Sequence, residues 1–195
     1  MVCAKQYAFV YRCCCLISCY ARISTYDMEN LSVLFCSSAT EYIRQQTEYI
    51  KKCVGRLSDE QVWHQPNEAA NSIANLILHL CGNTTQYILS SLGGRPDERQ
   101  RDLEFSIRKG YSKISLLQQL NAVVTEACKV IEQQSTDSLM TVRSVQGFQK
   151  TGLSIILHVT EHFSYHTGQI ALLTKLMTNE DLGFYKGLDL NRKNG

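Results

Sequence analysis

The chain has 195 residues, of which 44% are hydrophobic and 19% are charged, and its formal net charge is +2. This composition predicts one globular domain with a sizeable core. Residues 1–27 carry three basic residues and one acidic residue, so residues 28–195 are neutral overall. A neutral domain lacks the basic field that nucleic acid requires, and no stretch reaches the ~18 apolar residues of a membrane span. We therefore expect neither a nucleic-acid partner nor a membrane span.

The first 27 residues differ from the rest of the chain because they hold five of the nine cysteines. Leu16-Ile17-Ser18-Cys19 looks like a lipoprotein signal-peptidase box, although the apolar run is short and Arg12 adjoins it. Three interpretations stay open: a non-native start with translation beginning at Met28, a leader for export or lipid anchoring, and a disordered extension. We favour the non-native start, with residues 28–195 as a single domain.

The four other cysteines are scattered singly and form no CxxC pair: Cys36, Cys53, Cys81 and Cys128. Single cysteines of this kind predict reduced, buried thiols in a cytoplasmic protein. A genuine leader in residues 1–27 would instead make the protein exported or lipid-anchored.

Two helices are predicted in the first half of the domain. Apolar residues recur at helical spacing over residues 30–55, and Ser58 with Gln61 then forms a capping-box pattern. The second long helix should run from about 71 to 92 and end at Gly93-Gly94. Residues 95–105 are dense in charges of both signs, which favours a solvated loop. The alternative is that Asp102 or Glu104 folds over a site to orient a ligand or move a proton.

The second half predicts two more helices, at 112–134 with Ser112 as N-cap and at 152–177. Between them, residues 140–150 alternate in polarity and contain Gly147, so they form a small hairpin or an extended crossover. Four amphipathic helices predict an all-α fold, a four-helix bundle. The connection between the second and third helices is long enough to cross over the bundle.

Histidines are concentrated in the last helix, where His162 and His166 are one turn apart and lie on or beside its apolar stripe. An unpaired buried imidazole group costs about 1–3 kcal/mol, and metal coordination would satisfy it. His79 lies in the equally apolar second helix, so three rings from two helices would leave an open coordination position. The alternative is ordinary hydrogen-bonded core histidines. Spacing alone allows His158 with His162 equally well.

Several motifs occur in order along the chain: Leu57-Ser58-Asp59-Glu60-Gln61, Trp63, Gln65-Pro66-Asn67-Glu68, Asn71-Ser72-Ile73-Ala74, His79-Leu80, Gly82-Asn83, Arg101-Asp102, Glu104-Phe105, His162 and Tyr165-His166-Thr167-Gly168-Gln169-Ile170. Together they resemble an uncharacterised branch of the DinB-like (DinB/YfiT) superfamily of proposed metalloenzymes. The likeness covers most of residues 30–180, and none of it falls in residues 1–27.

This resemblance implies a four-helix bundle with crossover connections, often a homodimer. It also implies a divalent metal ion, with Zn, Ni, Mn and Fe as candidates, held by His79, His162 and His166. Asn83 and Gln169 would then be candidates for orienting neighbouring side chains, and His158 would lie a turn away, either around the ligands or as a core residue. Gly168 would permit close approach of helices. Some DinB-like relatives transfer low-molecular-weight thiols, so such a thiol is a candidate cofactor.

Our leading hypothesis is a metal-dependent enzyme, a transferase or hydrolase acting on a small-molecule substrate by thiol S-transfer or hydrolysis. No certain general base appears, and Glu161, Asp102 and Glu104 are the candidates for this catalytic role. The rival hypothesis is a non-catalytic metal-binding or sensing protein that acts through its dimer. A third is a plain helical interaction module.

Overall fold

The computed structural model describes the backbone of residues 7–195 and the side chains of residues 27–195. The regular secondary structure of this part of the chain is helical apart from one hairpin, which confirms the predicted all-α class with a short hairpin before the last helix. The elements in order are α1 (Tyr7–Gly55), α2 (Asp59–Trp63), α3 (Ile73–Thr84), the π-helix η1 (Thr85–Ser90), α4 (Arg101–Ser106), α5 (Lys113–Glu132), α6 (Thr136–Met140), β1 (Val142–Val145), β2 (Phe148–Thr151) and α7 (Gly152–Thr178).

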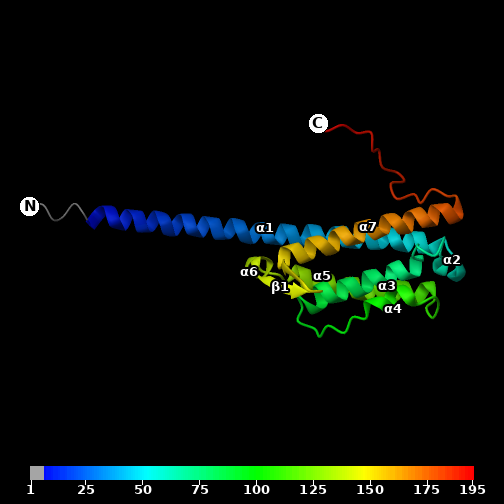
Figure 1. Cartoon of the computed structure of the whole chain (residues 1–195). Helices are drawn as coiled ribbons and strands as arrows, with labels where there is room; N and C mark the ends of the chain where they lie inside the picture. Colours follow the sequence, from blue (N-terminus) through cyan, green and yellow to red (C-terminus); the bar gives the residue numbers. More distant parts are fainter. Residues whose placement is uncertain (1–6) are drawn as a thin grey trace, which may run out of the picture.

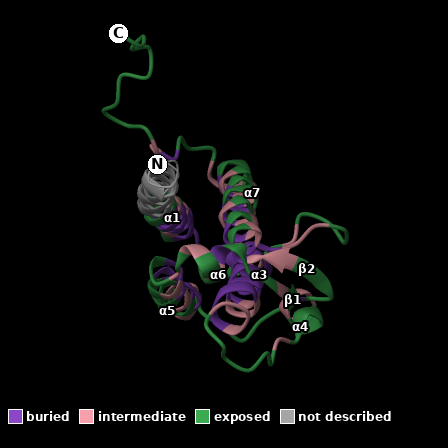
Figure 2. Ribbon diagram, turned by 90° about the vertical axis from the view of Figure 1, so that its left-hand side faces the viewer, coloured by how far each residue is buried: buried purple, intermediate pink, exposed green. Residues whose placement is uncertain are grey.

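Four long helices form the bundle: α1, α3 with its extension η1, α5 and α7 (Figure 1). Within the bundle, α1 packs against α5 and α7, and α3 packs against the same two helices. An end-on view places α1 and α3 at opposite corners of the bundle (Figure 2). The connections from α1 to α3 and from α5 to α7 therefore cross the bundle. The expectation that the connection after the second helix does so was wrong, because α3 and α5 are neighbours.

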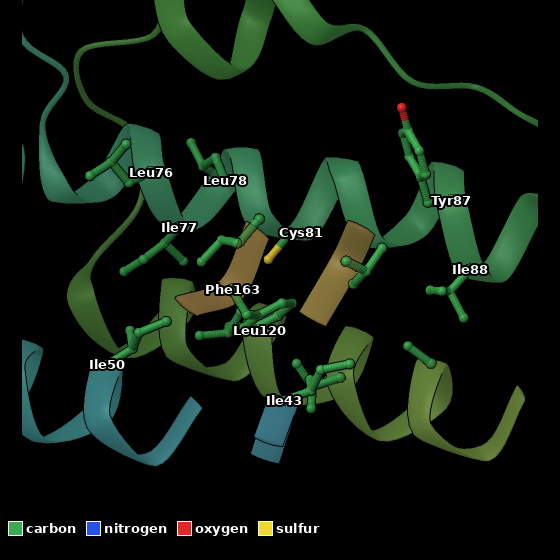
Figure 3. Close-up of a cluster of buried hydrophobic side chains, with 14 of the residues drawn as sticks. Ile43, Ile50, Leu76, Ile77, Leu78, Cys81, Tyr87, Ile88, Leu120 and Phe163 are labelled. Carbon is green, nitrogen blue, oxygen red and sulfur yellow. The ribbon is translucent and has the colours of Figure 1, made fainter. Parts of the chain in front are cut away.

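The core fills the space between these four helices (Figure 3). Ile43 and Ile50 of α1, Leu120 of α5 and Phe163 of α7 are fully buried and belong to one hydrophobic cluster. Cys81 of α3 is 2% exposed and lies in the same cluster, so its thiol faces the core. Burial of apolar side chains contributes roughly 25 cal/mol per Å² removed from water, so this cluster is what holds α3 and α7 in fixed positions.

Helix starts follow the predicted capping residues. Ser58 and Gln61 form both hydrogen bonds of the capping box at α2, and the Ser112 hydroxyl accepts a hydrogen bond from the backbone N–H of Ser115 at α5. The second predicted helix is not a uniform α-helix, because its last turns widen into η1. At the end of η1, the N–H of the C-cap residue Ser91 donates to the carbonyl of Gln86, five residues back. Such π-turns are frequent near functional sites because they shift the register of the side chains that follow.

The hairpin before α7 pairs β1 and β2 in antiparallel register, with Val145 opposite Phe148. Its turn, Gln146-Gly147, has positive φ at both positions (50° and 80°). The right-handed twist of paired strands favours this turn type, although a non-glycine residue adopts it at some cost. The Gln146 side chain is held in place, since its Oε1 accepts a hydrogen bond from the Tyr87 hydroxyl at 2.8 Å.

The interpretation of residues 1–27 stays a prediction. Residues 1–6 lie outside the described part of the chain, and for residues 7–26 only the helical backbone of α1 is described. None of the described helices is long and apolar enough to cross a lipid bilayer.

Candidate metal centre

Three imidazole rings meet where α3 packs against α7. His79 comes from α3, and His162 and His166 come from successive turns of α7. One nitrogen from each ring can be chosen so that all three lie within 4.8 Å of one another. His79 Nε2 is 2.9 Å from His162 Nε2, and the rings meet nearly edge-on, at interplanar angles of 66°, 86° and 84°. Tetrahedral ligands about 2.0–2.1 Å from one ion would lie about 3.3 Å apart, so little movement separates this cluster from a coordinating one.

In two of the rings, a hydrogen bond at Nδ1 fixes the tautomer. His79 Nδ1 is 2.8 Å from Glu104 Oε2, and His166 Nδ1 is 2.7 Å from Gln169 Oε1. Both partners are acceptor oxygens, so each Nδ1 carries the proton and donates it. The Nε2 atom of each ring then carries a lone pair rather than a proton. Metal-binding histidines in proteins are typically held in this way.

The two rings of α7 are also kept neutral. Burial, and then the neighbouring His166, His79 and His158, lower the pKa of His162 to about 3. Burial likewise lowers the pKa of His166, against the opposing effect of its hydrogen bond to Gln169. Only a neutral imidazole offers a lone pair to a cation. The donor set, its tautomers and its protonation state therefore fit a divalent metal ion.

Behind His79 lies a buried ion pair between Arg99 and Glu104. Arg99 Nε donates to Glu104 Oε1 at 2.7 Å and Arg99 Nη2 donates to Glu104 Oε2 at 2.8 Å. The two side chains are only 3% and 10% exposed. Burial raises the pKa of the Glu104 carboxyl, but the hydrogen bonds and charges of Arg99 and His79 outweigh it and hold that pKa below its usual value. Glu104 is therefore ionised, and both of its oxygens are occupied.

Further hydrogen bonds anchor this pair to η1. Arg99 Nη1 donates to Gln86 Oε1 at 2.8 Å, and Gln86 Nε2 donates to Asp97 Oδ2 at 2.8 Å. The chain from Asp97 to His79 thus alternates donors and acceptors through four hydrogen bonds. The segment before α4 is fixed against α3 by its polar side chains rather than by an apolar stripe.

Gly82 leaves the space that the Glu104 carboxylate occupies. A Cβ atom added at Gly82 would lie 1.9 Å from Glu104 Oε1, and the next nearest atom outside this carboxylate would be Arg99 Nε at 3.2 Å. No side chain fits there while the ion pair is in place. Gly168, which was expected to permit close helix approach, has no atom within 4 Å of an added Cβ, so that expectation was wrong.

A cavity of about 640 Å³ opens on the other side of the rings. Its lining includes two of the three histidines, residues of α4 and α7, and one residue just before α3: Asn71, His79, Arg101, Asp102, Phe105, Ser106, Tyr165, His166 and Gln169. A small molecule in this cavity would reach His79 and His166 directly. A larger hollow of about 830 Å³ lies beyond Glu104, but none of the three histidines lines it.

The three predicted catalytic carboxylates occupy different settings. Glu104 contacts His79 from behind, Asp102 is exposed and lines the cavity, and Glu161 is exposed on α7. Among the hydrogen bonds of the described residues, Asp102 and Glu161 make none to the three histidines. The expectation that residues 95–105 form a solvated loop was wrong for Arg99 and Glu104, which are buried because each neutralises the other.

Of the three residues expected around the ligands, Gln169 contacts a ring directly through His166. His158 stacks between Tyr87 and His162, with ring centroids 4.5 Å and 5.3 Å away. Asn83 lies one turn beyond His79, with its Nδ2 3.5 Å from His158 Nε2, at the outer limit of a hydrogen bond. Its buried Oδ1 has no hydrogen-bond partner among the described residues.

Three residues around the site were not singled out from the sequence: Arg99, Gly82 and Phe105. Phe105 packs on the His79 ring at 4.7 Å between centroids. Gly82 and Phe105 belong to the motifs on which the resemblance rests, next to the candidate residues Asn83 and Glu104. Their place in these motifs could have indicated that they lie at the site. Arg99 offered no signal, because its burial depends on a carboxylate that only the fold brings to it.

The fold defines a class of protein. A DinB-like protein of Bacillus cereus ATCC 10987 has a TM-score of 0.56 at 17% identity, and the match covers 69% of this chain and 87% of that one. A conserved protein of Enterococcus faecalis has a TM-score of 0.62 at 14% identity (74% and 97% covered). The DinB-like protein YjoA of Bacillus subtilis has a TM-score of 0.57 at 14% identity (74% and 94% covered). The chain thus has the DinB-like helical fold.

A match to a sequence family then identifies the family of this chain. The family described as "Protein of unknown function (DUF1572)" matches residues 30–192, most of the chain, and the protein belongs to it. This confirms the resemblance to an uncharacterised DinB-like branch. No curated protein shows significant similarity to the chain.

Proposed function

We propose that the protein is a divalent-metal-dependent enzyme whose ion is held by His79, His162 and His166. The observation that carries this proposal is that three imidazole nitrogens, one from each ring, lie within 4.8 Å of one another. In His79 and His166 the other ring nitrogen, Nδ1, donates a hydrogen bond to an acceptor oxygen, of Glu104 and Gln169 respectively. Imidazole ligands suit Zn, Ni and Fe, and Mn remains a candidate.

Each contacting residue has a separate task in this proposal. Glu104 orients His79, and Gln169 orients His166, so that both Nε2 lone pairs face the same point. Phe105 covers one face of His79 and keeps water from it. A divalent ion on three neutral histidines would lower the pKa of a water or thiol ligand and so supply a nucleophile near neutral pH. Its chemistry would be hydrolysis with water, or S-transfer with a low-molecular-weight thiol.

Proton transfer is assigned to Asp102 in this proposal. Both oxygens of Glu104 already accept hydrogen bonds from Arg99 and His79, so Glu104 orients a ligand rather than moving a proton. Glu161 is exposed and does not line the cavity. Asp102 lines the cavity beside His79 and His166, where a bound substrate would lie. A general base must be within hydrogen-bond reach of the proton that it removes.

The second candidate is a non-catalytic metal-binding or sensing protein that acts as a homodimer. Large apolar side chains exposed on the long helices favour it, among them Leu157, Leu172 and Leu176 of α7 (55%, 59% and 72% exposed) and Leu31 of α1 (60%). A second copy of the chain would cover such a surface. Light scattering on the purified protein measures the mass directly. A dimer without any metal-dependent turnover would favour this candidate.

The decisive test is elemental analysis of the purified protein and of two single variants, His79→Ala and His166→Ala. We expect about one metal ion per chain in the parent, and loss of the ion in both variants. His64→Ala is the matched control, since His64 is exposed at the end of α2, outside the cluster. A folded, metal-free parent that takes up no added ion would contradict the proposal. Turnover of thiol-electrophile pairs and of esters, with and without metal, then separates the enzyme from the sensor.

A further inference from the structure

The cavity beside the histidines is lined by polar groups that the protein itself leaves unused. Asn71, Arg101, Ser106 and Tyr165 line it, and within residues 27–195 their side chains make no hydrogen bond to another residue. Groups that only position the site are bonded within the protein, as Glu104 and Gln169 are. Donors that converge on a cavity without an internal acceptor are instead available to a bound molecule.

Arg101 is the charged member of this set, and aromatic contacts hold its position. Its guanidinium carbon lies 4.8 Å from the centroid of the Phe105 ring, and that ring packs at 4.7 Å on the ring of His79. Cation–π contacts of this kind favour one placement of a side chain without using its N–H donors. The guanidinium therefore sits one aromatic ring away from a proposed metal ligand, with its five donors free.

The charge around the cavity favours an anion. Glu104, the buried carboxylate of the site, is neutralised by Arg99, and no salt bridge of the described residues involves Arg101. Asp102 is the one acidic residue in the lining, and it is exposed. With a divalent ion on the histidines, the positive charges of that ion and Arg101 outweigh the single charge of Asp102. Guanidinium groups bind carboxylates through paired N–H donors.

We propose that the site takes a small substrate with an anionic group of the carboxylate class, which Arg101 binds while the substrate's reactive end lies beside His79 and His166. This inference rests on the proposed function and names the substrate class for the same site. Arg101 is its specificity residue. Asn71, Ser106 and Tyr165 add neutral donors around the same anion, and Asp102 disfavours a second negative charge.

The test compares two thiols of equal length that differ in one charge, 3-mercaptopropionate and 3-mercapto-1-propanol. Both are titrated into the full chain loaded with Co²⁺, and binding is followed by the change in the visible and near-ultraviolet absorption of the ion. We expect the carboxylate to bind about fivefold more tightly than the alcohol, the magnitude of one partly exposed ion pair. Arg101→Gln should remove most of this preference, since only the charge of the ion remains, Arg101→Lys should keep a larger part of it, and Asp102→Asn should increase it.

Arg192→Gln is the matched control, because it makes the same charge change in the exposed C-terminal tail, away from the cavity lining. Its preference should equal that of the parent. A parent that binds Co²⁺ but has the same carboxylate preference as Arg101→Gln would overturn the inference and leave the metal site intact. A parent that binds no Co²⁺ would overturn the proposed function, and the inference with it.

Discussion

The two sides of His79 are built in opposite ways. Behind the ring, a chain of hydrogen bonds runs from the buried side chains of Glu104 and Arg99 through Gln86 to the exposed Asp97. In front of it, the cavity is lined in part by Asn71, Arg101, Ser106 and Tyr165, whose side chains make no hydrogen bond to another residue within residues 27–195. The groups on the first side can be shielded from water at little cost in free energy, because each is hydrogen-bonded, and they fix the orientation of the His79 ring. The second side is open, so a molecule can bind there and leave, as a substrate cavity requires.

This difference separates residues that shape the site from residues that meet a ligand. Substitutions on the paired side should affect folding and metal affinity together, since an unpaired buried charge is expensive. Substitutions on the open side should leave stability almost unchanged and act on binding or turnover. The following predictions test this separation, beginning with the largest effect.

Glu104→Gln should be the most damaging single substitution of the paired side. It leaves the guanidinium of Arg99, only 3% exposed, without a counter-charge. We expect the free energy of unfolding to fall by about 3–5 kcal/mol in urea titrations. Metal affinity should fall by about 10–100-fold, because His79 loses its carboxylate acceptor.

A double-mutant cycle separates the two effects of Glu104. Arg99→Met together with Glu104→Gln removes both charges, so we expect most of the stability to return while metal affinity stays low. Glu132→Gln is the surface control, since Glu132 pairs with Arg44 where both are about half exposed (44% and 54%). It should cost less than about 1 kcal/mol. Equal costs for Glu104→Gln and Glu132→Gln would contradict the account.

Gly82→Ala should be destabilising although alanine is the better helix former. The added Cβ would lie 1.9 Å from Glu104 Oε1, so the ion pair must move. We expect a loss of about 1–3 kcal/mol together with weaker metal binding. Gly168→Ala is the matched control on α7, where an added Cβ meets nothing within 4 Å, and it should gain about 0.5–1 kcal/mol. Equal stability changes in the two variants would refute the role of Gly82.

Acid should destabilise the metal-free protein through His162. Burial, then His166 and His79, lower the folded-state pKa of this ring from 6.5 to about 3, so the unfolded chain binds its proton more readily. The stability that the neutral ring contributes is complete above about pH 6.5. It is lost as pH falls from there towards 3, by up to about 1.4 kcal/mol per pH unit. Urea titrations at pH 7, 6 and 5 measure this slope, and an unchanged slope in His162→Gln would contradict the assignment.

Gln169→Ala should have the smallest effect of the four. It removes the acceptor of the 2.7 Å hydrogen bond from His166 Nδ1 at the edge of the cavity. We expect metal affinity to fall about tenfold in competition titrations with a chelator, and stability to fall by about 1 kcal/mol or less. Gln169→Glu keeps an acceptor oxygen and should restore most of the affinity. Identical affinities in both variants would show that Gln169 does not orient the ring.

Periodicity was enough to predict the helices, because a buried stripe repeats at 3.6 residues whatever lies opposite it. The same stripes placed His79, His162 and His166 on inward faces of helices two and four, and capping residues such as Ser58 and Ser112 marked where helices start. The π-turn of η1 was missed, since its residues have the same apolar pattern as a continuing α-helix. Helix adjacency was also missed, because loop length alone does not say which helices are neighbours.

The buried ion pair shows where local rules fail. Residues 95–105 are as charged as a solvated loop, and nothing in their order separates Arg99 from Arg95 or Arg101. Arg95 instead pairs with Glu126 where the two side chains are 53% and 47% exposed, whereas Arg99 is buried against Glu104. The difference arises only when α4 folds back onto α3 at Gly82. Two opposite charges can be buried when they pair with each other. This pairing depends on the tertiary structure and cannot be recognised from the local sequence.

The central claim is that three imidazole rings from α3 and α7 converge on one ion. The extended X-ray absorption fine structure of the bound metal in the purified protein tests it most directly. We predict three imidazole nitrogens at about 2.0–2.1 Å, and two in His79→Ala reconstituted at high metal concentration. Sulfur at about 2.3 Å, or fewer than three imidazoles in the parent protein, would contradict it.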